Sequence, residues 1–179
     1  MEVYVYQDRV SIPEKKLKHF EFDWSNKSVL ELGANVGKMG NYVLEKGANK
    51  YKGLELDKKM VEIGTGRYGL DLECMDVLKK RSWKTLSGGT DWDITIAMAL
   101  FHHFTDKELE RLFSIINSKV FIFEVPTGTT KTDLYYIRLE QSYAEMVKKC
   151  YGKVVEIVNS GATNDPYNKR VIFHCEKSI

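Results

Sequence analysis

A short β-rich run, Ser28–Leu32, ends at a glycine and is followed directly by the pattern of a helix. Gly33 closes the run, and Gly47 stands where a glycine commonly ends a helix. Between these glycines, apolar residues recur at helical spacing, at Val36, Met39, Val43 and Leu44. Glycine at the end of a strand lets the backbone turn sharply and approach a ligand closely. This join therefore predicts a strand–turn–helix unit of an α/β protein.

Strand and helix patterns continue to alternate along the chain. Further strands are predicted at Tyr51–Leu56, about Leu70–Met75, Trp92–Leu100 and Val120–Phe123. Asp57 can cap one intervening helix, and Thr105 and Glu108 have the spacing of a capping box at the start of another. We expect Pro126 to end the strand before it, and a long helix to follow over about Lys131–Lys149. This alternation predicts a parallel sheet with helices on both faces.

The two ends of the chain depart from the alternation. The last two strands, Val154–Val158 and Arg170–Cys175, have no helix between them, so we expect them to pair antiparallel through a loop at 161–168. The predicted fold class is therefore α/β: a doubly wound, mostly parallel seven-stranded sheet with a C-terminal antiparallel hairpin and helices on both faces. Residues 1–26 are predicted to form a helical extension.

That extension contains capping-box spacing and a possible apolar face, at Ser11, Glu14, Leu17 and Phe20. We expect a short helix there, lying across the sheet edge or the mouth of the ligand site. With 179 residues in all, the chain is the size of one domain, so 1–179 is predicted to be a single domain with 27–179 as its core.

Charge and cysteine content narrow the class of protein. The 27 Lys and Arg against 25 Asp and Glu leave a net charge of +2, which does not indicate a nucleic-acid binder, although basic clusters at 15–18 and 79–81 leave contact with phosphate open. Cys74, Cys150 and Cys175 include no C-x-x-C pair, so neither a disulfide framework nor structural zinc is indicated. No signal peptide is recognisable, and the longest apolar run is too short to span a bilayer. We expect a reduced, cytoplasmic protein with no membrane partner.

The glycine turn carries the strongest chemical signal. Its spacing, G-x-x-x-G-x-x-G at Gly33, Gly37 and Gly40, is not the G-x-G-x-x-G of a dinucleotide pyrophosphate site. Asn35 stands where a second glycine would admit the pyrophosphate. Glu31 lies two residues ahead of the first glycine, and an acid there suits a positively charged ligand better than a phosphate.

Two further acids follow the next two predicted strands. Glu55 lies 20 residues or so beyond the turn, where a carboxylate can accept both hydroxyls of a ribose. Asp76 can accept from an adenine amine, or it can cap a helix that begins near Val77. Successive strand ends thus offer backbone and carboxylates to a nucleoside.

The stretch Val29–Val125 resembles class I S-adenosylmethionine-dependent methyltransferases. Glu31–Gly37 is similar to their first motif, with Asn35 in place of the middle glycine, and Gly53–Asp57 and Cys74–Asp76 are similar to the second and third. Residues 93–104 and 120–124 resemble their fourth and fifth strands. The resemblance implies S-adenosyl-L-methionine as cofactor, held by residues at Glu31, Gly33, Ala34, Asn35, Gly37, Gly40, Glu55, Leu56, Asp76, Val77, Ala97 and Ala99.

Candidate catalytic residues are His102, His103 and Glu124, which follow the fourth and fifth predicted strands. The histidine pair suggests a role beside the acceptor or a turn packed under the adenosine. No metal site is predicted, because no Asp, Glu or Cys set completes it. Glu124 can act as a base or be a solvated loop acid. Tyr135, Tyr136, Arg138 and Tyr143 either line an acceptor pocket or form a half-buried helix face.

Asn164–Tyr167 looks like an amine-methyltransferase motif but stands in the final hairpin, where a turn is expected. The function predicted is methyl transfer by in-line displacement to an unidentified acceptor, with a small molecule favoured. An RNA or protein acceptor and a non-catalytic, partner-binding subunit remain the alternatives.

Overall fold

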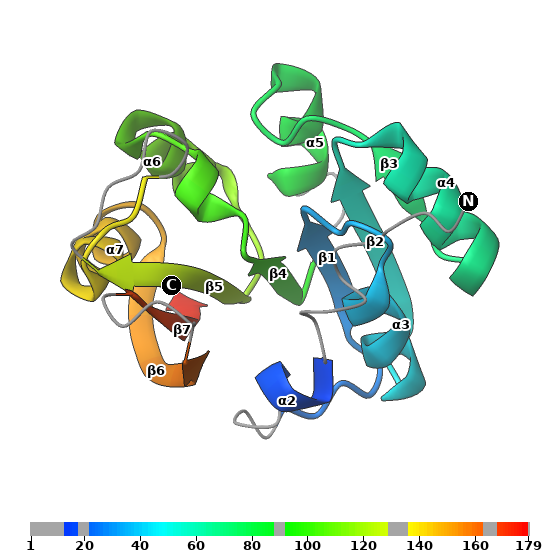
Figure 1. The fold of residues 1–179 in the computed structure, drawn as a ribbon, viewed down its shortest axis with the longest axis horizontal. Helices are drawn as coiled ribbons and strands as arrows, with labels where there is room; N and C mark the ends of the chain where they lie inside the picture. The colour runs from blue at the N-terminus through cyan, green and yellow to red at the C-terminus, as the bar shows by residue number, and fades with distance from the viewer. Residues whose placement is uncertain (1–12, 18–21, 88–91, 129–135, 163–167, 179) are drawn as a thin grey trace.

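The computed structural model describes residues 13–17, 22–87, 92–128, 136–162 and 168–178. Its strands form one sheet in the order β3-β2-β1-β4-β5-β7-β6 (Figure 1). Their bounds are β1 Ser28–Leu32, β2 Lys50–Glu55, β3 Leu72–Cys74, β4 Ile94–Met98, β5 Val120–Gly128, β6 Gly152–Ala162 and β7 Asn168–Lys177. The first five are parallel, and β7 runs antiparallel to both β5 and β6. The predicted fold class is confirmed.

Helices cover both faces of the sheet (Figure 1). They are α2 Pro13–Leu17, α3 Lys38–Glu45, α4 Lys58–Tyr68, α5 Trp83–Leu86, α6 Asp106–Ile115 and α7 Glu140–Cys150, with short 3-10 turns η1 Lys80–Ser82 and η2 Phe101–His103. One hydrophobic cluster joins α5, α6 and α7 to the sheet, and a second joins α2 and α3 to its other face. Each face of the sheet therefore contributes to its own core, as a doubly wound sheet requires.

The helix ends form as the sequence indicates. Thr105 and Glu108 make both hydrogen bonds of a capping box at the start of α6, and Asp57 accepts from the Lys59 N–H at the start of α4. Gly47, at a φ of 97°, donates to the Leu44 carbonyl just past the end of α3. The Asp57 cap thus joins β2 directly to α4, the Thr105 cap starts α6 after β4, and Gly47 ends α3 just before β2.

Pro126 does not end its strand, contrary to the prediction, because β5 continues to Gly128. The Val120 N–H donates to the Asp93 carbonyl, and the Glu124 carbonyl accepts from the Ala99 N–H, so both groups face β4. Backbone groups of every second residue face the same side of a strand, so the Pro126 nitrogen also faces β4. β4 has ended by then, since Met98 is the partner of Glu124. The missing N–H therefore removes no ladder hydrogen bond.

The helix predicted over 131–149 begins only at Glu140. Arg138 bridges to Thr127 in parallel register, so the chain before α7 pairs with the edge of β5 that β4 leaves open. Tyr136 and Arg138 therefore precede the helix, and Tyr143 lies on it, buried. Tyr135 lies outside the described residues.

Other boundaries also differ. β3 and β4 are shorter than predicted, and Ala99 follows β4 in a left-handed conformation with a φ of 55°. β6 and β7 are longer and take up both ends of the predicted loop at 161–168, while the turn predicted at Asn164–Tyr167 lies outside the described residues. Ser11 and Phe20 also lie outside them. Helix α2 lies on a face of the sheet, where Leu17 packs with Ile122 and Ile172, and not across the sheet edge.

Candidate functional site

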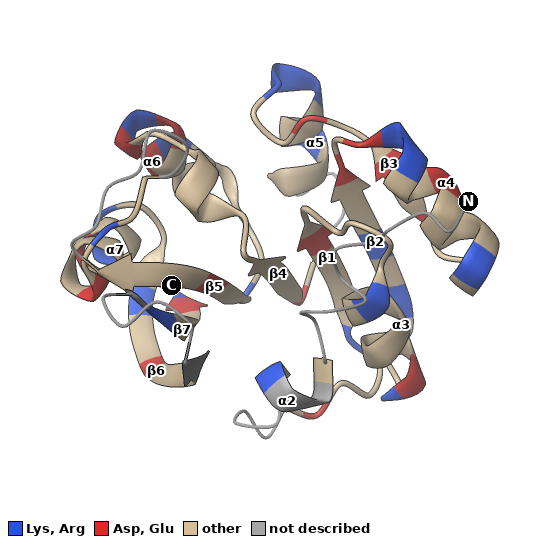
Figure 2. Cartoon of the chain, in the orientation of Figure 1, with Lys and Arg blue, Asp and Glu red and all other residues tan. Residues whose placement is uncertain are grey.

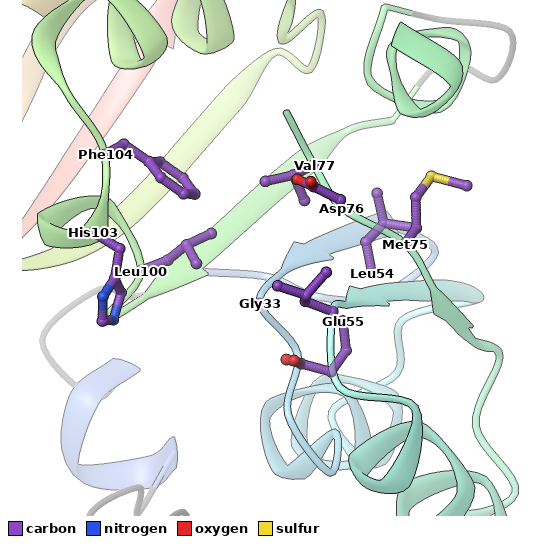
Figure 3. Close-up of a pocket in the computed structure, with 10 residues that line it drawn as sticks. Gly33, Leu54, Glu55, Met75, Asp76, Val77, Leu100, His103 and Phe104 are labelled. Atoms are coloured by element: carbon purple, nitrogen blue, oxygen red, sulfur yellow. The ribbon is translucent and has the colours of Figure 1, made fainter. Parts of the chain in front are cut away.

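A cavity of about 410 Å³ lies at the carboxyl ends of the strands, where open α/β sheets bind ligands. Figure 3 shows the side chains that surround it, which come from the ends of β1, β2 and β3 and from the segment after β4. They are Gly33, Leu54, Glu55, Leu56, Met75, Asp76, Val77, Leu100, His103 and Phe104. A cavity with mostly apolar walls and a few carboxylates is suited to a nucleoside-sized ligand.

Glu55 is held rigidly at this cavity. One carboxylate oxygen accepts from the Asn35 N–H at 2.7 Å, and the other accepts from the Asp57 N–H at 2.9 Å. Asn35 has a φ of 51°, and its own side-chain oxygen accepts from the Val36 N–H at 2.9 Å. Asn tolerates this left-handed conformation better than most residues, which explains why it can replace the middle glycine. The turn therefore orients the Glu55 carboxylate.

Gly33 and Gly37 both adopt left-handed conformations, with φ of 69° and 76°. A Cβ on Gly33 would lie 3.1 Å from Leu100, across the cavity wall. Gly37 precedes α3 and packs against Leu70, so its role is close packing of the turn. Gly33 lines the cavity, whereas Gly37 and Ala34 do not.

Glu31 is buried beneath the turn, with 1% of its surface exposed, and does not line the cavity. Tyr51 Oη donates to its carboxylate at 2.6 Å. Burial raises the pKa of Glu31 to about 8, against the lowering effect of this hydrogen bond. Gly40 has no Cβ because one would overlap the Tyr51 ring. Glu31 and Gly40 thus form an internal support for the turn.

Asp76 lies at the cavity but does not cap a helix near Val77, because residues 77–79 form a turn and the next helical turn, η1, begins at Lys80. Its side chain lines the cavity together with Val77, and one carboxylate oxygen accepts from the Leu78 N–H at 2.9 Å. Leu56 also lines the cavity and is 69% exposed. Ala97 is fully buried in β4, and neither it nor Ala99 reaches the cavity wall.

The two histidines have different environments. His103 is exposed overall and lines the cavity, and partial burial lowers its pKa. His102 is 7% exposed, and its ring centroid lies 4.2 Å from that of His103. Burial, His103 and Arg170 lower the pKa of His102 to about 3, so its ring is neutral near pH 7. His103 is therefore the histidine with access to a ligand.

Glu124 lies inside β5 and not in a loop, and it is 1% exposed. Lys16 Nζ lies 2.5 Å from one carboxylate oxygen, and the Ser160 hydroxyl donates to the other at 2.7 Å. Arg170 reaches the first oxygen at 3.5 Å. We call these residues, Lys16, Glu124, Ser160 and Arg170, the β5 ion cluster. Glu124 does not line the cavity.

Sequence reasoning omitted several site residues. Leu54, Met75, Leu100 and Phe104 form much of the cavity wall but look like ordinary apolar residues in the sequence. Tyr51, Lys16, Ser160 and Arg170 have no local signal, because their partners are far along the chain. Within the described ranges, no three His, Cys, Asp or Glu residues are grouped to hold a metal ion. No described helix has the length and apolar character needed to cross a membrane.

No family model matches this chain, and no curated protein is significantly similar to it in sequence. Its fold is similar to that of an S-adenosylmethionine-dependent methyltransferase from Clostridium acetobutylicum, with a TM-score of 0.74 and 12% identity over 97% of this chain and 95% of that one. It is also similar to magnesium protoporphyrin IX methyltransferase from Synechocystis with bound SAH, with a TM-score of 0.73 and 13% identity over 99% of this chain and 89% of that one. A third similar structure is geranyl diphosphate C-methyltransferase from Streptomyces coelicolor, with a TM-score of 0.72 and 9% identity over 93% of this chain and 79% of that one. At these identities the likeness establishes the fold.

Proposed function

We propose that this chain, which has the fold of class I S-adenosylmethionine-dependent methyltransferases, is itself such an enzyme and acts on a small-molecule acceptor. The observation that carries the proposal is the Glu55 carboxylate. It lies at the end of β2 in the cavity wall, and the Asn35 and Asp57 N–H groups hold its two oxygens. A carboxylate in this position can accept both hydroxyl groups of a ribose.

The other cavity residues suit the rest of the cofactor. Met75, Val77 and Phe104 offer apolar surface for a flat base, and Asp76 can accept from its amine. Gly33 leaves the backbone of the β1 turn open at the opposite wall. A volume of about 410 Å³ is within the range of small-molecule sites. This chemistry fits S-adenosylmethionine better than a dinucleotide, because the Gly33–Gly40 turn has no pyrophosphate spacing.

S-adenosylmethionine, when bound, would supply a methyl group attached to its sulfonium. When that methyl group is transferred, the sulfur is left as a neutral thioether. The protein's main contribution is to position an acceptor in line with that methyl group and to exclude water. Leu100 and Phe104 provide the water-excluding wall after β4. His103, neutral near pH 7 because its pKa is lowered, can take a proton from an acceptor that must lose one.

A small acceptor is supported by two similar enzymes. Their names identify magnesium protoporphyrin IX and geranyl diphosphate as the molecules they methylate. The similarity spans 99% and 93% of this chain, and 89% and 79% of those two chains. The acceptor of this chain is a separate question, since fold does not specify substrate.

Titration calorimetry with S-adenosylhomocysteine tests the proposal. We expect the wild type to bind, and Glu55→Ala to weaken binding at least about tenfold through loss of the ribose hydrogen bonds. Glu62→Ala is the matched control, because Glu62 is an exposed carboxylate on α4 whose side chain pairs only with Lys58 among the contacts described. If the wild type does not bind, the enzyme proposal is wrong and a partner-binding subunit becomes the better hypothesis. If both variants weaken S-adenosylhomocysteine binding equally, Glu55 is not a ribose ligand.

A further inference from the structure

The β5 ion cluster holds more positive than negative charge. Lys16 already neutralises Glu124, at 2.5 Å and with side chains 9% and 1% exposed. Arg170 adds a second cation on the same carboxylate. Among the residues that the structure describes, Glu124 is the only acid within ion-pair distance of Arg170. Figure 2 shows one acidic position within β5 and basic positions on α2 and β7.

The contact between Arg170 and Glu124 is weak. A single guanidinium nitrogen lies 3.5 Å from the carboxylate oxygen, at the outer limit of a hydrogen bond. An arginine has five N–H donors in a planar fork that matches a carboxylate or a phosphate. The Arg170 side chain is 23% exposed, whereas those of Lys16 and Glu124 are nearly covered. Arg170 is therefore the member of the cluster that a ligand can reach.

Arg170 also lies on the correct side of the sheet for a methyl acceptor. Arg170, in β7, is the register partner of Pro126 in β5. This position lies beyond the end of β4, so Arg170 belongs to the carboxyl edge of the parallel strands. Its charge acts on His102, and His102 contacts His103 in the cavity wall. Arg170 is therefore close to the histidine pair, of which His103 lines the proposed cofactor cavity.

We propose that Arg170, supported by Lys16, binds an anionic group of the methyl acceptor, either a carboxylate or a phosphate. This inference rests on the proposed function, because it assigns the acceptor class to the same site. This cluster has two cations and one carboxylate, and only Lys16 and Glu124 are nearly covered, so its net positive charge attracts an anion at the part-exposed Arg170. Glu31, with a pKa of about 8, is largely protonated at neutral pH and does not cancel the excess.

Anion titrations followed by NMR test the inference. Inorganic phosphate and acetate are titrated separately at constant ionic strength, with and without S-adenosylhomocysteine, and backbone amide signals of β7 and of the His102–His103 turn are followed. We expect saturable shifts for at least one anion, and the tighter anion identifies the phosphate or the carboxylate class. Arg170→Gln should weaken binding at least about tenfold, and Arg170→Lys should weaken it less, because the charge remains without the fork.

Lys169→Gln is the matched control. Lys169 is the adjacent residue of β7, is exposed, and faces the opposite side of the strand, so this variant removes the same charge without altering the cluster. Thermal unfolding shows whether each variant is folded, and Arg170→Lys serves if Arg170→Gln is not. The inference is wrong if no saturable shift occurs, or if Arg170→Gln and Lys169→Gln bind the anions equally well.

The parallel calorimetry separates the two proposals. S-adenosylhomocysteine binding without an anion response would overturn this inference and leave the methyltransferase proposal standing. An anion response in a wild type that does not bind S-adenosylhomocysteine would overturn the proposed function, and with it the acceptor role assigned to Arg170.

Discussion

Tyr51 Oη donates a 2.6 Å hydrogen bond to Glu31, and both side chains are buried, at 6% and 1% exposure. The bond links β2 to β1 directly below the glycine turn. Glu31 pairs with Gly53 in the sheet, and Tyr51 lies two residues earlier on the same face of β2. Glu31, which the sequence predicts to contact the ligand, is therefore part of the internal support of the site.

Burial of Glu31 predicts a pH-dependent stability. Its pKa is about 8 in the folded protein against 4.5 as the ordinary value, so the folded state binds more protons between these pH values. The free energy of unfolding should therefore fall as pH rises from 4.5 to about 8, by on the order of 1 kcal/mol per pH unit from this group.

Urea unfolding across this pH range measures the slope. Glu31→Gln should flatten the pH dependence, because an amide does not titrate and can still accept from Tyr51. Glu62→Gln, at an exposed acid, should retain the wild-type slope. The same slope in wild type and Glu31→Gln would mean that Glu31 is not the titrating group.

Alanine substitutions at Gly40 in α3 and Gly66 in α4 should have opposite effects on the free energy of unfolding. At Gly40 a Cβ would overlap the Tyr51 ring, so Gly40→Ala should destabilise the protein by about 1–3 kcal/mol and displace the Tyr51–Glu31 pair. At Gly66 nothing lies within 4 Å, so Gly66→Ala should stabilise by about 0.5–1 kcal/mol. Denaturant midpoints test both, and equal effects of the two substitutions would contradict the packing argument.

Lys16 and Glu124 should be strongly coupled. Lys16→Met leaves a buried carboxylate with only the distant Arg170 and the Ser160 hydroxyl, so we expect a loss of about 2–4 kcal/mol. Glu124→Gln should also destabilise, and the double variant should lose less than the sum. A double-mutant cycle in urea measures this coupling. Additive losses would show that the ion pair does not hold α2 on the sheet.

The histidine pair should titrate unequally. NMR titration of the imidazole signals should find His102 neutral down to about pH 3, because burial, His103 and Arg170 all disfavour its charged form. His103 should titrate below the ordinary value of 6.5, with burial as the cause. His103→Gln assigns the signals and should raise the pKa of His102, since one repelling cation is removed. A His102 pKa at or above 6.5 would contradict the buried environment.

Local patterns in the sequence predict much of this fold. The Thr105–Glu108 capping box and the Asp57 cap form as predicted, because these hydrogen bonds join residues that are close in sequence. The carboxylate of Glu55 also reaches the cavity as predicted, since the end of a parallel strand next to a glycine turn leaves few alternatives. The ends of elements are less predictable, as β5 shows by continuing through Pro126.

Partners across the sheet are what the sequence does not reveal. Hydrophobic spacing indicates which face of an element is buried but not what it contacts, so the sequence predicts that Glu31 faces the cofactor and that Glu124 is either a base or a solvated loop acid. In the structure each is buried, and each has a partner from another segment: Tyr51 on β2 and Lys16 on α2.

The sequence by itself determined the alternation of strands and helices, the caps and the glycine turn, because each depends on residues within a few positions of one another. Only the tertiary structure decided which acids face the cavity and which are paired inside the protein. Lys16 and Glu124 are 108 positions apart, and no local interaction specifies their contact. It forms when α2 packs on the sheet, where desolvation makes an unpaired charge costly and so selects a partner.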